Sequence, residues 1–176
     1  MFYGVLDIET KRSAQEVGGW QLANKMGISC AVLYNSATKA YETYLDNQIE
    51  ELLAVMFRME LIVGFNIKRF DYRVLSGYIK TDYKKLPTLD LLEHVHQRLG
   101  YRLSLDHLGE ITLGTPKSAN GLQALLWWKE GKIDEIIEYC KKDVQLTKDL
   151  YEYGKENGYV LFQNKAKQVV RLPVSW

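Results

Sequence analysis

Residues 2–8 read FYGVLDI, an apolar run that ends in carboxylates, since Glu9 follows Asp7 by two positions. Short apolar runs of this kind are typical of strands buried in a sheet. Successive side chains of a strand point to opposite faces, so Asp7 and Glu9 share one face and lie near each other. Because the segment is otherwise apolar, we expect a central strand with two acids at its carboxyl end.

The remaining apolar pattern predicts one mixed sheet with helices packed on it. The β-rich runs 28–34 and 40–45 predict a hairpin, and 61–65 predicts a further buried strand. Asn47 with Glu50 has the spacing of a helix capping box. Helices are expected at 49–57, 71–79, 87–99, 104–109, 121–129 and 133–154, the last stopped by Gly154. Residues 11–26 are expected as a loop, and 159–162 and 168–174 as late edge strands. This order is that of an α/β fold.

Length and charge narrow the class of protein. The 176 residues fit one domain spanning 1–176. With 23 basic and 22 acidic residues, the net charge of +1 excludes a polybasic arm and an acidic tail. No apolar run approaches the roughly 20 residues of a membrane span, and the amino terminus lacks a secretory signal. Two cysteines cannot form a disulfide framework, so we expect a cytoplasmic protein in a reducing environment.

Acidic residues recur where they need a physical explanation. Asp7 and Glu9 repel each other, and a divalent cation would relieve that repulsion; two solvent-exposed acids at a strand end are the alternative. Asp71 follows the strand 61–65 at a helix start, where an acid also serves as a simple cap. Tyr139 and Asp143 are four residues apart on one helix face, a spacing that a solvated helix surface shows as well.

Together these segments resemble the DEDD superfamily of 3′–5′ exonucleases. Asp7-Ile8-Glu9 matches its first motif, and Asn66 followed by Phe70-Asp71 matches its second. Tyr139 and Asp143 match the third motif in its tyrosine branch, because Glu138 stands where the histidine branch has its histidine. Residues 104–131 are also similar to predicted prokaryotic exonucleases related to the proofreading domains of family B DNA polymerases. The resemblance implies a ribonuclease H-like fold with a central mixed five-stranded sheet, in strand order 3-2-1-4-5, flanked by helices.

The same resemblance implies a metal-dependent exonuclease that hydrolyses phosphodiester bonds at a 3′ end, with DNA favoured over RNA and a role in DNA repair. Asp7 would bridge two divalent ions, Mg²⁺ or Mn²⁺. Glu9 and Asp143 would complete one metal site, and Asp71 would support the other, partly through water. Tyr139 would orient the attacking water rather than act as a strong base, because the ordinary pKa of tyrosine is near 10.

The expected partner is nucleic acid, as a single strand or as the 3′ end of DNA or RNA. No association with a membrane is expected. Six residues are candidates for holding it: Thr10, Lys11, Asn66, Phe70, Lys117 and Ser118. Phe70 fits a core position equally well, and single lysines are commonly solvated. Two other functions stay open: an endonuclease or junction resolvase on the same fold, and a non-catalytic nucleic-acid-binding module. The start at Met1 favours a protein that stands alone over a piece of a helicase or polymerase.

Overall fold

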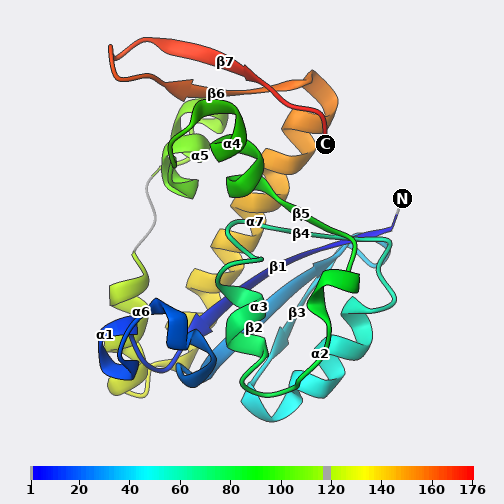
Figure 1. The fold of residues 1–176 in the computed structure, drawn as a ribbon, viewed down its shortest axis with the longest axis vertical. Coiled ribbons are helices and arrows are strands. Elements are labelled where there is room, and N and C mark those ends of the chain that lie inside the picture. The colour runs from blue at the N-terminus through cyan, green and yellow to red at the C-terminus, as the bar shows by residue number, and fades with distance from the viewer. Residues whose placement is uncertain (1, 117–119) are drawn as a thin grey trace.

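A mixed five-stranded sheet organises the computed structural model, which describes residues 2–116 and 120–176 (Figure 1). The strand order is β3-β2-β1-β4-β5, which confirms the predicted order and fold class. β1 pairs antiparallel with β2 and parallel with β4, and so occupies the centre. The strands are β1 (Tyr3–Thr10), β2 (Ile28–Asn35), β3 (Ala40–Tyr44), β4 (Leu61–Gly64) and β5 (Thr88–Asp90).

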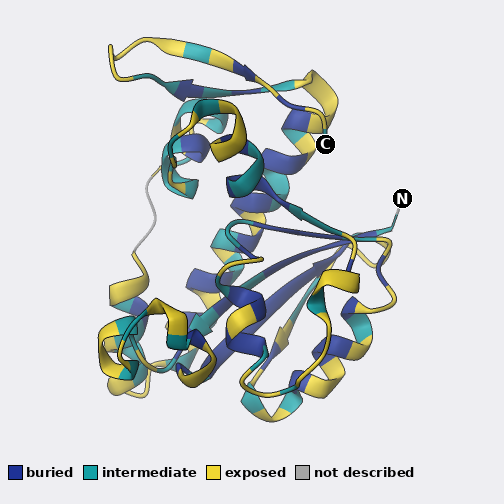
Figure 2. Ribbon diagram, in the orientation of Figure 1, coloured by how far each residue is buried: buried dark blue, intermediate teal, exposed yellow. Residues whose placement is uncertain are grey.

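Helices cover both faces of the sheet, so the central strands are buried on both sides (Figure 2). One face packs against the long α7 (Ile133–Asn157) and α6 (Gly121–Lys129), and the core on this side extends beyond the sheet to α4 (Leu91–Leu99) and to α5 (Leu105–Leu113), which packs on α7. The other packs against α1 (Ala14–Val17), the 3₁₀ segment η1 (Trp20–Lys25), α2 (Ile49–Met56) and α3 (Asp71–Leu75).

The alternation along β1 decides where its acids point. Tyr3 and Val5 belong to the core that contains α7, whereas Leu6 and Ile8 belong to the core that contains α2 and α3. Asp7 has the parity of Tyr3 and Val5, and Glu9 continues it, so both carboxylates emerge on the α7 face. The expected central strand with two acids at its carboxyl end is therefore confirmed.

The predicted helix over 87–99 was wrong at its start. Thr88 and Leu89 instead form the fifth strand and pair in parallel with Ile62 and Val63. Asp90 ends that strand and caps α4, accepting hydrogen bonds from the backbone N–H groups of the second and third helical residues. The β-branched Thr88 and the cap at Asp90 agree with this boundary, but only the neighbouring edge of β4 makes the preceding residues a strand.

The two late strands are confirmed to within one residue at each end. Tyr159–Gln163 (β6) and Val169–Pro173 (β7) pair with each other in a two-stranded sheet that is separate from the central one. α7 is 25 residues long, about 37 Å at 1.5 Å per residue, and carries the chain away from the central sheet (Figure 1). The hairpin then docks on α5, where the Thr112 hydroxyl donates to the Leu161 carbonyl at 2.9 Å.

The prediction that Gly154 stops α7 was wrong, because this glycine lies inside the helix. The helix ends at Asn157, and Gly158 forms the cap with φ of 74°. A Cβ atom at Gly154 would lie 2.6 Å from the indole of Trp176, so the glycine makes room for the carboxyl-terminal residue. The need for a glycine here comes from a tertiary contact, so the neighbouring sequence does not predict it.

Four smaller boundaries differ from the prediction. The expected loop 11–26 contains α1 and η1, and α1 is opened by a capping box between Ser13 and Glu16. Asn47 does not cap α2, because the 3₁₀ turn Asp46–Gln48 (η2) precedes that helix. α3 ends at Leu75 rather than 79, and α5 continues past Gly109 to Leu113. A further 3₁₀ turn, η3, spans Tyr83–Lys85. Within the described ranges, every helix is too short or too polar to cross a membrane.

Asp90 ties the loop after β4 to α4. Its carboxylate is buried and accepts from the backbone N–H groups of Asn66 (2.9 Å), Lys68 (3.2 Å), Leu92 (3.1 Å) and Glu93 (3.2 Å). Asn66 has a left-handed φ of 66°, so these bonds hold a conformation that is otherwise unfavourable for it.

We expect Asp90→Ala to lower the free energy of unfolding by about 2–4 kcal/mol, because it leaves buried donors without an acceptor. Urea denaturation would measure the loss. Asp82→Ala is the matched control, because Asp82 is exposed and caps only η3 through the Lys84 N–H. A loss at Asp90 no larger than at Asp82 would contradict this account.

Candidate metal centre

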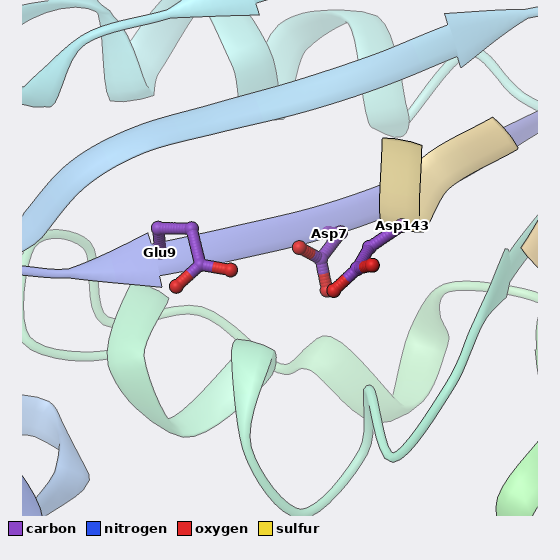
Figure 3. A group of neighbouring side chains, drawn as sticks. All are labelled: Asp7, Glu9 and Asp143. Carbon is purple, nitrogen blue, oxygen red and sulfur yellow. The ribbon is translucent and has the colours of Figure 1, made fainter. Parts of the chain in front are cut away.

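Three carboxylates converge at the carboxyl end of β1. Asp7 and Glu9 extend from the strand and Asp143 from α7, and their oxygens lie within 4.8 Å of one another (Figure 3). Asp143 reaches this position because Cys140 and Val144, on the same helix, are buried against the sheet. The structure therefore brings together two of the predicted motifs, which are more than 130 residues apart in sequence.

Burial and mutual repulsion make it unfavourable for all three carboxyl groups of this cluster to be ionised at once. Burial raises the pKa of Asp7 well above its usual value, and the charge of Asp143 raises it further. Burial also raises the pKa of Glu9, followed by the charges of Asp7 and Asp143. A bound divalent cation would reverse this penalty, because it attracts each carboxylate in its ionised form.

Asp71 approaches the same centre from α3. It is only 2% exposed, and its Oδ1 atom has no hydrogen-bond partner. Its pKa is raised by burial and next by the charge of Asp7, which shows that the two carboxylates influence each other. It is not among the residues whose oxygens lie within 4.8 Å of one another. Asp71 is also not the cap of α3, whose N-cap position is Phe70.

These four acids suit a hard divalent ion. The donor set is all oxygen, as Mg²⁺ and Mn²⁺ prefer, and it contains no thiolate or imidazole of the kind zinc selects. The buried Oδ1 atom of Asp71 lacks any other partner, which is the state expected of an oxygen that coordinates an ion directly or through water.

Tyr139 lies one helical turn before Asp143 and hydrogen bonds to its carboxylate. Burial, and then the charge of Asp143, raise the pKa of Tyr139 well above its ordinary value. The phenol therefore stays protonated at neutral pH and can donate a hydrogen bond, but it is unsuited to remove a proton. Its ring packs edge-on against Trp127, with centroids 6.3 Å apart, which restricts its rotation.

Cys140 supports Asp7 from behind. Its thiol is fully buried and lies 3.3 Å from both the backbone carbonyl and Oδ2 of Asp7. Burial raises the pKa of this thiol, so it remains a protonated donor rather than a nucleophile. Cys140 thus fixes one carboxylate oxygen of Asp7 and leaves the other available.

A cleft of about 520 Å³ opens over the carboxylates. Asp7, Tyr139 and Asp143 form its acidic side, and Asn66, Arg102 and Ser104 lie among the residues that complete it. The Arg102 guanidinium donates to the Asn66 side-chain oxygen at 2.9 Å, which fixes the amide of Asn66 at the rim.

The residues predicted to contact substrate differ in where they lie relative to the cleft. Asn66 lines the cleft, and Phe70 is half-buried beside the exposed ring of Trp20. The Thr10 hydroxyl donates to the Arg12 carbonyl at 3.0 Å. Lys11 forms an ion pair with Asp46 and lies over the ring of Trp128. Both therefore have internal partners, and their contact with substrate stays a prediction. Lys117 and Ser118 lie outside the described residues.

Two residues of the site were missed by sequence reasoning. Asp90 could have been found, because an Asp followed three residues later by Glu93 is a helix-start signal. Arg102 had no signal of its own, since a lone arginine after Gly100 is typical of any surface turn. Its role depends on contact with Asn66, which is 36 residues away.

Comparison with known proteins identifies the family of the chain. The family model of the RNase_H superfamily matches residues 5–154, a range that begins within β1 and contains the other four strands of the central sheet and most of α7. The chain belongs to the RNase_H superfamily. This membership places it among nuclease-type hydrolases that use divalent metals and act on nucleic acid. No curated protein matches the chain significantly.

A solved structure shares the fold of this superfamily member. The family B DNA polymerase from the hyperthermophilic archaeon Pyrobaculum calidifontis superposes with a TM-score of 0.67 and 16% sequence identity. The match covers 88% of this chain and 24% of the polymerase, so the chain spans about a quarter of that protein's length. At this identity the likeness concerns the fold.

The raised carboxylate pKa values predict an effect on stability. In EDTA at neutral pH, we expect Asp7→Asn to melt higher than the parent, at about 2–4 °C per kcal/mol of relieved repulsion. A carboxyl whose folded pKa is raised loses stabilising protonation as the pH rises above its ordinary pKa of about 4. The advantage of Asp7→Asn should therefore grow with pH.

Thermal melts at several pH values, with and without Mn²⁺, measure this effect. Mn²⁺ should raise the melting temperature of the parent and not that of Asp7→Asn. Glu156→Gln is the control, because Glu156 is exposed at the far end of α7 and the carboxylate cluster stays intact. This variant should melt like the parent in EDTA, and Mn²⁺ should stabilise it as much as the parent. A lower melting temperature for Asp7→Asn in EDTA would contradict the electrostatic account.

Proposed function

We propose that this nuclease-superfamily protein is a metal-dependent 3′–5′ exonuclease. The observation that carries the proposal is the convergence of Asp7, Glu9 and Asp143, with Tyr139 bonded to the last of these. Three acids and a protonated phenol at the end of a central strand are the elements of metal-assisted phosphodiester hydrolysis.

The chain's own groups would divide the work. Asp7, Glu9, Asp71 and Asp143 would hold Mg²⁺ or Mn²⁺. Ions bound there would polarise the scissile phosphate and lower the pKa of water. Tyr139 would orient the attacking water in line with the phosphorus by turning its one hydroxyl proton from the Asp143 carboxylate to the water, once ions hold that carboxylate. Cys140 would keep Asp7 in one rotamer.

Exonucleolytic attack at a terminus is supported by the size of the cleft. About 520 Å³ is in the range that encloses one small ligand, such as a terminal nucleotide. Attack from the 3′ end is supported by the arrangement of the three motifs. DNA as the preferred substrate is supported by the structural likeness to a DNA polymerase.

Two substitutions separate metal binding from water positioning. We expect Asp7→Ala to abolish metal-dependent digestion, because it removes the carboxylate at the centre of the cluster. Tyr139→Phe should leave residual activity, lowered by about 10²-fold, because water loses a positioning donor while the acids remain. Initial rates on a labelled oligonucleotide measure both, with Glu156→Gln as a control. Full activity in Asp7→Ala would refute the assignment.

The polarity of digestion needs a separate assay. With Mg²⁺ or Mn²⁺, 5′-labelled strands should shorten in single-nucleotide steps, while 3′-labelled strands should lose their label at once as mononucleotide. EDTA should stop both reactions, and matched DNA and RNA strands would give the preference. Discrete internal products from both labels would indicate an endonuclease or resolvase, and binding without digestion would indicate a non-catalytic module.

A further inference from the structure

The carboxyl-terminal hairpin of β6 and β7 carries charge of one sign. Residues 158–176 contain Lys165, Lys167 and Arg171 and no acidic residue. Among the described residues, no ion pair joins these three cations to a carboxylate. The hairpin also lies beyond residues 5–154, the range that the family model matches. It is therefore a basic addition to the part of the chain that forms the metal centre.

One edge of this hairpin is covered by α5. The Leu161 carbonyl accepts a hydrogen bond from the Thr112 hydroxyl at 2.9 Å, and the Leu161 N–H donates to the same hydroxyl at 3.0 Å. The Gln163 N–H donates to Nε2 of His107 at 3.1 Å. β6 thus lies between α5 and β7, and these outward backbone groups of β6 have partners within the chain.

The other edge, along β7, is open. The Val174 N–H donates to the Gly158 carbonyl at 2.9 Å. Hydrogen-bonded and non-bonded pairs alternate along antiparallel strands, so the even-numbered residues of β7 are the ones that bond to β6. The backbone groups of Val169 and Arg171 therefore point away from β6, and within the described ranges they have no hydrogen-bond partner. In Figure 1, β7 is the outer strand of the hairpin.

The side chains along this edge are accessible and positively charged. Val169 is 56% exposed, and Arg171 shares its face of the strand. The Arg171 guanidinium lies over the ring of Tyr159, 4.3 Å from the ring centre, which holds it in place without neutralising its charge. The edge therefore combines unpaired backbone groups, an apolar side chain and a fixed cation.

These features distinguish between possible occupants. A second copy of the chain would add a strand with the same positive charges and no acid to compensate them, and like charges on neighbouring strands are unfavourable. A DNA backbone carries acceptors and no donors, so it cannot pair with the carbonyls of Val169 and Arg171. An extended polypeptide supplies donors and acceptors together, and acidic side chains on it would complement the cations.

The two ends of the open edge limit the length of an added strand. Pro173 takes the next outward position of β7 and has no N–H to donate. At the other end, Lys167 has a left-handed φ of 62°, which interrupts the extended backbone. A short edge flanked by proline and lysine resists indiscriminate aggregation. A partner must consequently gain much of its affinity from its side chains.

We propose that the open edge of β7 binds an extended acidic segment of a partner protein by strand addition. The segment pairs with the outward backbone groups of Val169 and Arg171, and its carboxylates face Arg171 and Lys167. This docking role is independent of the proposed nuclease activity, because the edge shares no residue with the carboxylate cluster.

Titration with synthetic peptides tests the edge directly. The probe is a short peptide that alternates valine and glutamate, added to isotope-labelled protein whose backbone N–H signals are followed by nuclear magnetic resonance. The signals of Val169 and Arg171 should shift, and their exchange with solvent should slow. A matched peptide with lysine in place of glutamate should bind more weakly. A matched peptide with proline in place of valine should also bind more weakly, because it keeps the charge but cannot donate to the strand.

Charge reversal gives the sharpest comparison. Arg171→Glu should weaken binding of the glutamate peptide about 5-fold or more and should favour the lysine peptide, a reversal that a misfolded hairpin could not produce. Val169→Pro removes one outward N–H and leaves the bonds to β6 in place, so it should weaken the glutamate peptide about 5-fold. Arg58→Glu is the matched control, because Arg58 is exposed in the turn between α2 and β4, and it should bind like the parent.

Several results would overturn the proposal. These are no shift with the glutamate peptide, equal binding of the three peptides, and parent-like binding of the glutamate peptide by Arg171→Glu. A DNA oligonucleotide that displaces the peptide from the same signals would instead make the hairpin a nucleic-acid surface. A concentration-dependent dimer that shifts the signals of Val169 and Arg171 without peptide would make a second copy the occupant.

Discussion

The burial of β1 on both faces is the constraint on which the site depends. A strand covered by α7 on one side and by α2 and α3 on the other has no freedom to shift its register, since a one-residue slip would exchange core and carboxylate positions. Asp7 and Glu9 are consequently held on the α7 face at the end of the strand. The hydrophobic core thus determines where the negative charge is placed.

The same rigidity makes the acidic cluster costly without a counter-ion. Burial and mutual repulsion raise the pKa values of Asp7, Glu9 and Asp71, and one oxygen of Asp71 has no partner. Residues whose pKa values are perturbed in this way cluster at functional sites, where their function outweighs their cost in stability. Tyr139 and Cys140 contribute in protonated form, one facing the cleft and the other fixing Asp7. Among the residues that the structure describes, the carboxylates are therefore the bases of the site.

Prediction from the sequence succeeded where a residue's role is local. The alternation of β1, the hairpin of β2 and β3, and the helical stripe of α7 all depend on neighbours within a few residues. It failed where the role depends on distant contact. Thr88–Asp90 is a strand because β4 lies beside it, and Gly154 leaves room for the indole of Trp176 rather than stopping the helix.

The sequence by itself determined the chemical type of the site: carboxylates with strand and helix periodicity, in the order of three recognisable motifs. Tertiary structure decided which of them meet, bringing Asp143 to Asp7 and Glu9 while Asp71 stays outside the tight cluster. It also placed β6 between α5 and β7, so that β7 is the outer strand of the hairpin. The physical reason is that periodicity specifies which face a side chain occupies, whereas distances between faces are set only when two hydrophobic cores pack on one sheet.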